Sequence, residues 1–392
     1  MREKFLPFSL PTFNQEEKDA ISKVIDSGWV TTGPITNEFE TKFSQYVGAK
    51  YAIAVSSCTA ALHLSLAALG VKAGDWVITT PFTFAATANV ILHLGAKPLF
   101  VDICADTFNV DHEKINSCLK KNIRSKRGKI KGIVVVHYAG LPCQMDAILL
   151  TAKKFGFFVI EDAAHALGSE YKGKKIGAIS DATCFSFYPT KLITTGEGGM
   201  VAVDKKNIAN RIRILSSHGI TKSSWKRYSK ENQWKYKIIF PGFKYNMTDL
   251  QAYIGICQLS KLDYFIEKRR EYCSIYDNFF KNLKEVCIPA EDSNVFHSSH
   301  IYPILLNTQF LRINRDEFMA KLKAMNIGTS VHFIPLHLHP VYKKLGYKKG
   351  DFPVCEHIYR RILSLPLFPA MTRSDIDDVV NAVSQIIKNN KK

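Results

Sequence analysis

The stretch FSFYPTKLITTGEGGM, residues 185–200, places a single lysine, Lys191, between an aromatic run and a cluster of glycines. Ser186 stands five residues before the lysine, and the glycines begin five residues after it. Glycine allows a close approach of backbone segments. A lysine framed in this way is expected to be desolvated, so that it loses its charge easily and becomes a nucleophile toward carbonyl groups. The alternative is an exposed lysine in a loop.

A second motif, VSSCTAALHL at residues 55–64, reads as a strand end followed by the start of a helix. The unpaired amides and the dipole at a helix start attract anions. Ser57, Thr59 and Ala60 are therefore candidates for holding a phosphate. Ordinary N-capping by serine or threonine is the commoner explanation of such a pattern.

A third motif, FFVIEDAAHALGS at residues 157–169, ends a buried strand with two acids. A buried aspartate needs a partner because an unpaired buried charge is costly. The ring nitrogen of a bound cofactor would serve Asp162, and so would a salt bridge or a helix N-cap. His165 is either a cofactor contact or a structural polar residue.

In combination these motifs match the needs of pyridoxal 5'-phosphate. Its phosphate needs amides and hydroxyls, its ring nitrogen needs a carboxylate, and its aldehyde needs a lysine. Each motif alone is a weak signal. The three in this order predict a site for this cofactor.

Around the motifs, strand-like and helix-like segments alternate through the first 250 residues. Strands are expected at 51–56, 75–81, 97–103, 131–139, 157–164, 182–189 and 198–204, with helices between several of them. Such repeats are typical of an α/β fold with a mostly parallel sheet. Residues 1–250 are predicted to form this large domain.

After residue 250 the pattern changes. A long helical pattern at 248–283, short strands at 298–306 and 328–335, and a last helix at 373–389 predict a smaller α+β domain over residues 251–392. The lysine-rich stretch at 222–237 is expected to form a loop or a hairpin.

The composition limits the class of protein. No apolar stretch is long enough for a membrane span, and the N-terminus lacks the apolar core of a secretory signal. Nine scattered cysteines without a CxxC pair indicate reduced thiols and a cytoplasmic protein. The net charge of +18 could serve nucleic acid, an anionic small substrate or solvated loops. Because no nucleic-acid-binding motif accompanies the charge, nucleic acid is not expected as a partner.

The chain resembles the DegT/DnrJ-type sugar aminotransferases, which have the fold-type I, aspartate-aminotransferase-like architecture. The resemblance runs almost end to end, through SGWVTTGPITNEFE, SSCTAALHLSL, TTPFTFAATANVI, IEDAAHALGS, CFSFYPTKLITTGEGGM, GFKYNMTDLQAYIG, VHFIPLH and LSLPLFPAMT. It implies that Lys191 forms the internal aldimine with the cofactor and that Asp162 pairs with the ring nitrogen. It also implies phosphate contacts from Ser186 and the Thr59–Ala60 amides, stacking by Phe84, and a place for His165 near the ring hydroxyl.

One segment departs from the family pattern. Many members have Asn-Tyr-Arg-Met where this chain has Lys244-Tyr245-Asn246-Met247. In the family this segment reaches the phosphate in the partner subunit, so the resemblance implies a homodimer with a shared site and a phosphate contact from Asn246. The KYN form and LSLPLFPAMT resemble the branch that makes 4-amino-4-deoxyarabinose on a uridine nucleotide. Thr31, Lys244 and His332 are expected to bind substrate.

The implied reaction is the transfer of an amino group from L-glutamate to a nucleotide-linked keto-sugar by a ping-pong mechanism. A related sugar dehydratase and a non-catalytic regulatory or binding protein of the same fold remain as alternatives. Lys191 argues against the dehydratase, in which histidine replaces the lysine. The histidines of VHFIPLHLHP lack acid or cysteine ligands nearby, so no metal is expected.

Overall fold

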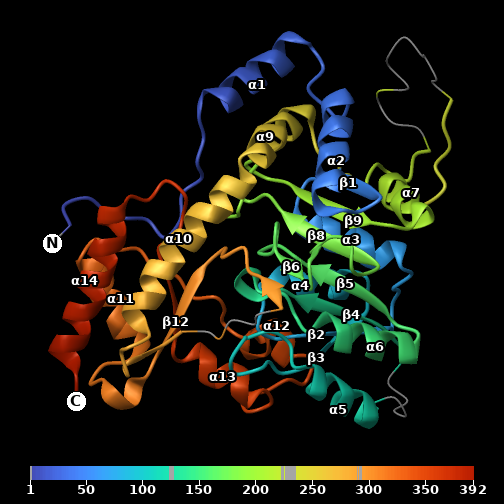
Figure 1. The fold of residues 1–392 in the computed structure, drawn as a ribbon. Helices are drawn as coiled ribbons and strands as arrows, with labels where there is room; N and C mark the ends of the chain where they lie inside the picture. The colour runs from blue at the N-terminus through green and yellow to red at the C-terminus, as the bar shows by residue number, and fades with distance from the viewer. Residues whose placement is uncertain (1, 123–127, 222–224, 226–234, 289, 291–293) are drawn as a thin grey trace.

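The protein is described by a computed structural model that covers every residue except 1, 123–127, 222–224, 226–234, 289 and 291–293 (Figure 1). Its central sheet has seven strands, all formed between residues 51 and 203. In spatial order these are β1 (Tyr51–Val55), β9 (Gly199–Val203), β8 (Ala182–Ser186), β5 (Phe158–Asp162), β4 (Ile130–Val136), β2 (Trp76–Thr79) and β3 (Lys97–Phe100).

Most neighbouring strands of this sheet are parallel, as the alternation of strands and helices in the sequence predicts. The pairs β5–β8, β4–β5, β2–β4 and β2–β3 are parallel, whereas β9 is antiparallel to both of its neighbours. The continuous apolar strands are typical of a parallel sheet that is covered on both faces. The predicted α/β fold with a mostly parallel central sheet is therefore confirmed.

Helices cover the two faces of the sheet. Alternate residues of β1 show this, because Ala52 and Ala54 belong to one apolar core and Ile53 and Val55 to another. The first core includes α2 (Pro34–Val47), α5 (His112–Asn122), α6 (Met145–Phe155) and α9 (Asp249–Ser260). The second includes α3 (Cys58–Ala68), α4 (Ala85–His93) and α7 (Lys206–Leu215). Helix α1 (Gln15–Asp26) packs against α9.

A second, antiparallel sheet forms toward the C-terminus. It consists of β10 (Val286–Cys287), β12 (Tyr302–Leu306) and β13 (Ile362–Leu365). Helices α10 (Leu262–Phe280), α11 (Arg315–Ala324) and α14 (Arg373–Asn390) share an apolar core with it, and Leu6 belongs to the same core. Figure 1 shows the N-terminal segment beside α14. The first residues of the chain thus pack with the last. The boundary between domains at residue 250 stays a prediction.

The remaining elements are short. They are the small sheet of β11 (Val295–Phe296), β6 (Glu170–Tyr171) and β7 (Lys174–Lys175), the helices α12 (Pro340–Lys343) and α13 (Pro353–Tyr359), and the 3-10 turns Tyr138–Gly140, Thr308–Phe310 and Leu336–Leu338.

Two predicted elements differ from those observed. The helical pattern at 248–283 is divided at Lys261, whose side chain pairs with Glu16 and Glu17 of α1. The prediction of a strand at 328–335 is wrong. Only Ser330 pairs with β13 there, and Pro335, which has no N–H to donate, ends the apolar run. This segment forms part of a pocket wall instead.

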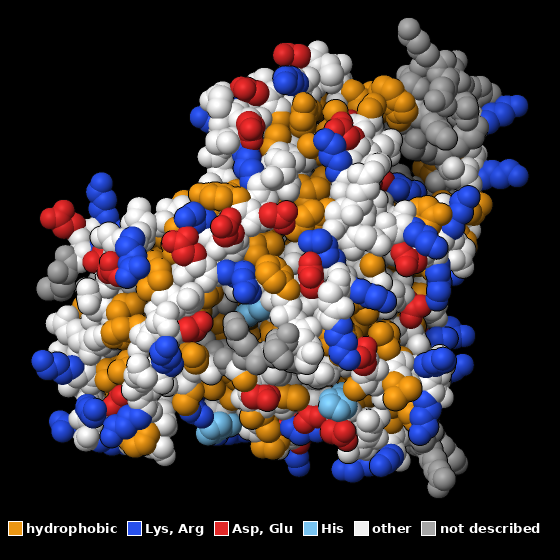
Figure 2. Space-filling model, in the orientation of Figure 1, with side chains coloured by type: hydrophobic (Ala, Val, Ile, Leu, Met, Phe, Trp, Pro, Cys, Tyr) orange, Lys and Arg blue, Asp and Glu red, His pale blue; other side chains and the backbone are white. Residues whose placement is uncertain are grey.

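No helix among the described residues is long and apolar enough to cross a membrane. No disulfide bond forms between the cysteines, all nine of which are among the described residues. The lysine-rich stretch at 222–237 lies mostly outside the described residues. Basic side chains on the face shown in Figure 2 are interspersed with acidic and apolar ones, and they form no single basic patch among its described residues.

Candidate active site

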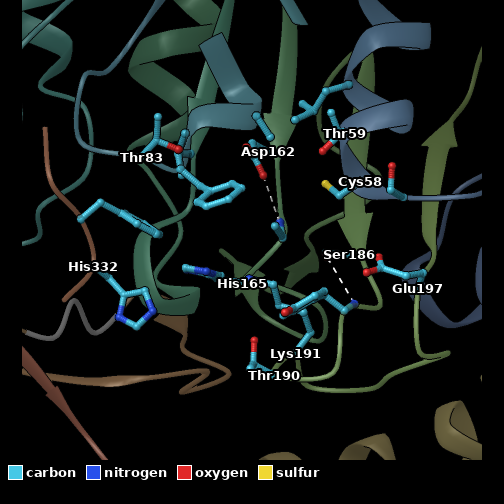
Figure 3. Close-up of a pocket in the computed structure, with 18 of the residues that line it drawn as sticks. Cys58, Thr59, Thr83, Asp162, His165, Ser186, Thr190, Lys191, Glu197 and His332 are labelled. Carbon is cyan, nitrogen blue, oxygen red and sulfur yellow. Dashed lines mark hydrogen bonds between the residues drawn. The ribbon is translucent and has the colours of Figure 1, made fainter. Parts of the chain in front are cut away.

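A cavity of about 480 Å³ lies at the carboxyl edge of the central sheet, the usual place for ligands in such folds. Three neighbouring strands contribute their last residues to its wall: Val136 from β4, Asp162 from β5 and Ser186 from β8. The start of α3 and the loop that follows β8 close two further sides (Figure 3). The cavity therefore brings together the three motifs that are dispersed over more than a hundred residues of sequence.

Lys191 projects into this cavity from the loop between β8 and β9 (Figure 3). The loop is tied by its backbone, since the amide of Lys191 donates to the carbonyl of Tyr188 at 2.8 Å and the amide of Phe187 to that of Gly198 at 2.9 Å. The Lys191 ammonium has no hydrogen bond or ion pair with any described residue. Burial lowers its pKa to about 8, although the negative charge of Asp162 acts in the opposite direction. The exposed-loop alternative for this lysine is thereby excluded.

Asp162 faces the same cavity and is only 6% exposed. Its carboxylate accepts hydrogen bonds from the Thr87 hydroxyl at 2.7 Å and from the Ala164 amide at 3.2 Å. Burial raises its pKa, whereas these donors and the charge of Lys191 lower it. No salt bridge to Asp162 forms among the described residues. The carboxylate is thus positioned to receive a cation from a ligand.

The neighbouring acid, Glu161, points to the other side of the strand, as the alternation of side chains in a strand requires. It is fully buried and bonds to His137 at 2.8 Å and to Thr183 at 2.8 Å. Of the two acids at the end of β5, only Asp162 is available to the cavity.

The first turn of α3 borders the cavity near Lys191. Ser57 caps the helix by accepting the amide of Ala60 at 3.1 Å, so Ala60 is engaged in the cap and does not line the cavity. Cys58 and Thr59 do line it, and their amides have no acceptor within the helix. Gly199 allows β9 to lie against this turn, because a Cβ there would come within 2.5 Å of the Ser57 backbone. The result is a positive helix end that suits an anion.

The opposite wall carries rings. Phe84 is 65% exposed although it is apolar, and it lies over the cavity near Phe333. His165 is 6% exposed, and its Nδ1 has no hydrogen-bond partner among the described residues. His332 bonds to the Ser364 hydroxyl at 2.9 Å, and burial lowers its pKa to about 3. Burial also lowers the pKa of His165 well below its usual value, so both histidines are neutral near pH 7.

Three residues proposed from the sequence lie outside this cavity in the single chain. The carbonyl of Thr31 accepts the amide of Asp249, and Asn246 donates to the Thr32 hydroxyl at 2.7 Å. Lys244 bonds to the side chain of Asn246. Asn246 pairs through its backbone with Val55 and borders a separate hollow of about 600 Å³. One chain therefore does not bring these residues to Lys191.

Comparison with known proteins agrees with this geometry. Residues 11–384 match the DegT/DnrJ/EryC1/StrS aminotransferase family. This chain belongs to that family. The aminotransferase is 53% identical to MJ1066 of Methanocaldococcus jannaschii over the whole of both chains. It is 46% identical to the spore coat polysaccharide biosynthesis protein SpsC of Bacillus subtilis, over 99% of this chain and 98% of SpsC.

A solved structure extends the comparison. The putative sugar aminotransferase Spr1654 of Streptococcus pneumoniae, in its pyridoxamine phosphate form, superposes with a TM-score of 0.89 at 31% identity, covering 98% of this chain and 99% of that one. A pyridoxal phosphate form of the same protein gives the same TM-score. The chain is therefore a pyridoxal-phosphate-dependent sugar aminotransferase of fold type I.

The residues of the cavity fit this cofactor. A buried carboxylate with no ionic partner in the described part of the chain faces the cavity, a lysine with a lowered pKa reaches into it, and a helix start offers free amides. The unpaired Nδ1 of His165 is a further polar atom in its wall.

Sequence reasoning missed several residues of the wall. Tyr188, Thr190 and Glu197 lie within the stretch that carries Lys191, so their position in the sequence could have indicated them. Thr83 directly precedes Phe84. Ser330 comes from a segment that was predicted as a strand, and no local signal identifies it.

Proposed function

We propose that this aminotransferase moves an amino group from L-glutamate to a nucleotide-linked keto-sugar, a UDP-4-keto-sugar in particular. The sugar as acceptor is supported by the similarity to Spr1654 and to SpsC. The uridine nucleotide and position C4 are supported by the resemblance of residues 244–247 and 363–372 to the 4-amino-4-deoxyarabinose branch. The observation that carries the proposal is Lys191, depressed in pKa, in one cavity with Asp162.

The cofactor would be held at both ends. The first turn of α3, with Thr59 and the hydroxyls of Ser57 and Ser186, would bind its phosphate. Asp162 would face the ring nitrogen, and the exposed ring of Phe84 would cover one face. When bound, pyridoxal phosphate supplies a ring that withdraws electrons from the α-carbon of the amino donor.

Lys191 would carry the proton transfers. An amine with a pKa of about 8 is partly neutral at physiological pH, so it can accept a proton and return it. Its Nζ would take the proton from the α-carbon of the amino donor. In the second half-reaction the same Nζ would deliver a proton to the carbon of the sugar that receives the nitrogen.

The side chains that contact the substrate and the phosphate would come from two chains. His332 lies in the cavity of its own chain, with one ring nitrogen bonded to Ser364, and would contact the sugar. Asn246, Lys244 and Thr31 lie outside it. We therefore infer a homodimer in which Asn246 reaches the phosphate in the other copy and Lys244 and Thr31 contact substrate. The location in the cytoplasm stays a prediction.

Part of the positive charge would serve the diphosphate of the substrate. Lys222, Lys226 and Arg227 are the candidates from the sequence, and they lie outside the described residues. Neutralising them should raise the KM for the nucleotide sugar and leave the KM for the amino donor unchanged. Unchanged kinetics with both substrates would exclude this role for the charge.

The experiment that tests the function is a visible absorption spectrum of the purified protein with pyridoxal phosphate, recorded before and after L-glutamate. Wild type should show a yellow band that glutamate bleaches, and Lys191→Ala should show no bleaching. A panel of UDP- and dTDP-linked keto-sugars should then restore the band, the UDP-4-keto-sugar most rapidly. If glutamate does not bleach the band, the amino donor is another compound. If only dTDP-linked sugars restore the band, the proposed uridine nucleotide is refuted.

A further inference from the structure

Two threonine hydroxyls connect the cavity wall to Asp162. Thr83 lines the cavity and is 2% exposed, while Thr87 on α4 is fully buried. The Thr83 and Thr87 hydroxyl oxygens are 2.8 Å apart, and the Thr87 hydroxyl is 2.7 Å from Oδ2 of Asp162. The other carboxylate oxygen, Oδ1, receives the amide of Ala164. Thr83 directly precedes Phe84, the N-cap of α4, and Thr87 lies in the first turn of that helix, so the chain folds back at the helix start and the two hydroxyls meet.

The charge of Asp162 fixes the direction of these bonds. An ionised carboxylate only accepts, so the single hydrogen of the Thr87 hydroxyl must point to Asp162. The Thr87 oxygen is then the acceptor in its contact with Thr83, so Thr83 must donate. Both O–H dipoles therefore point toward the carboxylate, and aligned bonds of this kind strengthen one another. A protonated carboxyl group would remove the need for this order, because it could donate as well.

We propose that Thr83 and Thr87 act as a pair of positioning residues that keeps Asp162 ionised and fixes Oδ2, so that the carboxylate can hold a cationic ring nitrogen. This inference rests on the proposed role of Asp162 toward the cofactor. It assigns a function to two buried hydroxyls that are hydrogen-bonded in series to the carboxylate. Because the hydrogen of the Thr83 hydroxyl is directed to Thr87, its oxygen can only accept hydrogen bonds from the cavity.

The opposite face of β5 offers a matched control. Thr183 donates to Glu161 at 2.8 Å, and both side chains are buried. This bond resembles the Thr87–Asp162 bond in type, length and burial, but neither residue lines the cavity. Thr183→Val therefore removes an equivalent buried bond without touching the candidate site.

The test is the binding of pyridoxal phosphate to the cofactor-free protein from pH 5 to pH 9, for wild type, Thr87→Val, Thr87→Ser, Thr83→Val and Thr183→Val. A carboxylate that loses a donor takes up a proton at higher pH. Thr87→Val should weaken binding roughly ten- to a hundredfold at pH 7 and move the acid loss of affinity to higher pH. Thr83→Val should give a smaller shift in the same direction. Thr87→Ser and Thr183→Val should bind as wild type does.

The other titratable groups near Asp162 are Lys191, His137, Cys58 and Cys184. All four are unchanged in these variants, as is the titration of the cofactor itself. A shift of the acid limb between variants therefore reports on Asp162.

Three results would overturn the inference: equal affinities in all five proteins, a loss in Thr87→Val that is uniform across pH, or an equal loss in Thr183→Val. If Thr87→Val does not fold, Thr83→Val tests the inference, because its loss of cofactor affinity at acid pH must still move to higher pH. Asp162→Asn distinguishes the proposed role of Asp162 from the proposed role of the threonine pair. Normal binding and normal glutamate turnover in this variant would refute the proposed role of Asp162. Strong impairment of Asp162→Asn with no effect in Thr83→Val and Thr87→Val would refute only the threonine pair.

Discussion

At the scale of the residue, the chemistry depends on two opposed effects of burial. Burial lowers the pKa of Lys191 and raises that of Asp162, because both charged forms are disfavoured away from water. The charge of each residue acts against this effect in the other. One cavity thus contains a lysine that is neutral often enough to act as a base and a carboxylate that can still be ionised.

The lowered pKa of Lys191 predicts a pH dependence in the cofactor-free protein. Only the neutral amine forms a covalent bond with the aldehyde of pyridoxal phosphate, so the rate of attachment should rise with pH and level off above about 8. Stopped-flow absorbance measures this rate. A lysine with the ordinary value of 10.5 would continue to gain reactivity well beyond pH 9, and such a profile would contradict the burial of Lys191.

At the scale of the element, the start of α3 and the strand β9 define the end of the cavity that we propose to bind the phosphate. Gly199 pairs with Val55 and Ser186 in the sheet and lies against the backbone of Ser57 and Cys58. A strand with a side chain at this position could not lie so close to the first turn of the helix. The glycine cluster after Lys191 therefore shapes the proposed phosphate site as well as the loop of the lysine.

Gly199→Ala tests this packing. The added Cβ would come within 2.5 Å of the Ser57 backbone and 2.6 Å of the Cys58 amide nitrogen, which cannot move aside as a flexible side chain can. We expect affinity for pyridoxal phosphate to fall about tenfold or more, while affinity for pyridoxal without phosphate changes little. Equilibrium titration with both compounds measures the difference.

Gly255→Ala is the control for general destabilisation. Its Cβ would meet the ring of Phe39 at 2.5 Å in the first apolar core, and neither residue lines the cavity. A lower melting temperature with unchanged cofactor affinity is expected for this variant. Equal losses for phosphorylated and unphosphorylated cofactor in Gly199→Ala would show that β9 does not shape the phosphate site.

At the scale of the whole molecule, one chain contains the lysine end of the site but not the Asn246 end. Asn246 is bonded to Thr32 and Lys244 beside β1, away from the cavity. A second copy is needed if Asn246 is to reach a phosphate. The proposed homodimer would then be a requirement of the chemistry.

Mixing two inactive variants tests the shared site. Lys191→Ala and Asn246→Ala should each lose most activity as separate proteins. After exchange of subunits, mixed dimers contain one site with both Lys191 and Asn246 intact, so activity should partly return. A transamination assay after partial unfolding and refolding of the mixture measures this, with a mixture of Lys191→Ala and Asp162→Asn as the control. No recovery in a mixture shown to contain mixed dimers would refute the shared site.

The sequence by itself determined the class of fold and the class of chemistry. Apolar strands, intervening helices and their order are encoded by residues close together in the chain, so the parallel sheet, Lys191, Asp162 and the start of α3 could be predicted. The break at Lys261 and the irregular segment at 328–335 depend on contacts with α1 and β13, and local patterns misrepresented both.

Only the tertiary structure decided which side chains meet. The strand order placed β4, β5 and β8 side by side, and this brought Val136, Asp162 and Ser186 together in the cavity wall. The packing of α4 brought Thr87 to Asp162, and the segment that pairs with β13 brought Ser330 to the same wall. It also left Asn246 outside the cavity of its own chain. The physical reason is that burial and hydrogen bonding act between neighbours in space, and residues hundreds of positions apart become neighbours only when the sheet has formed.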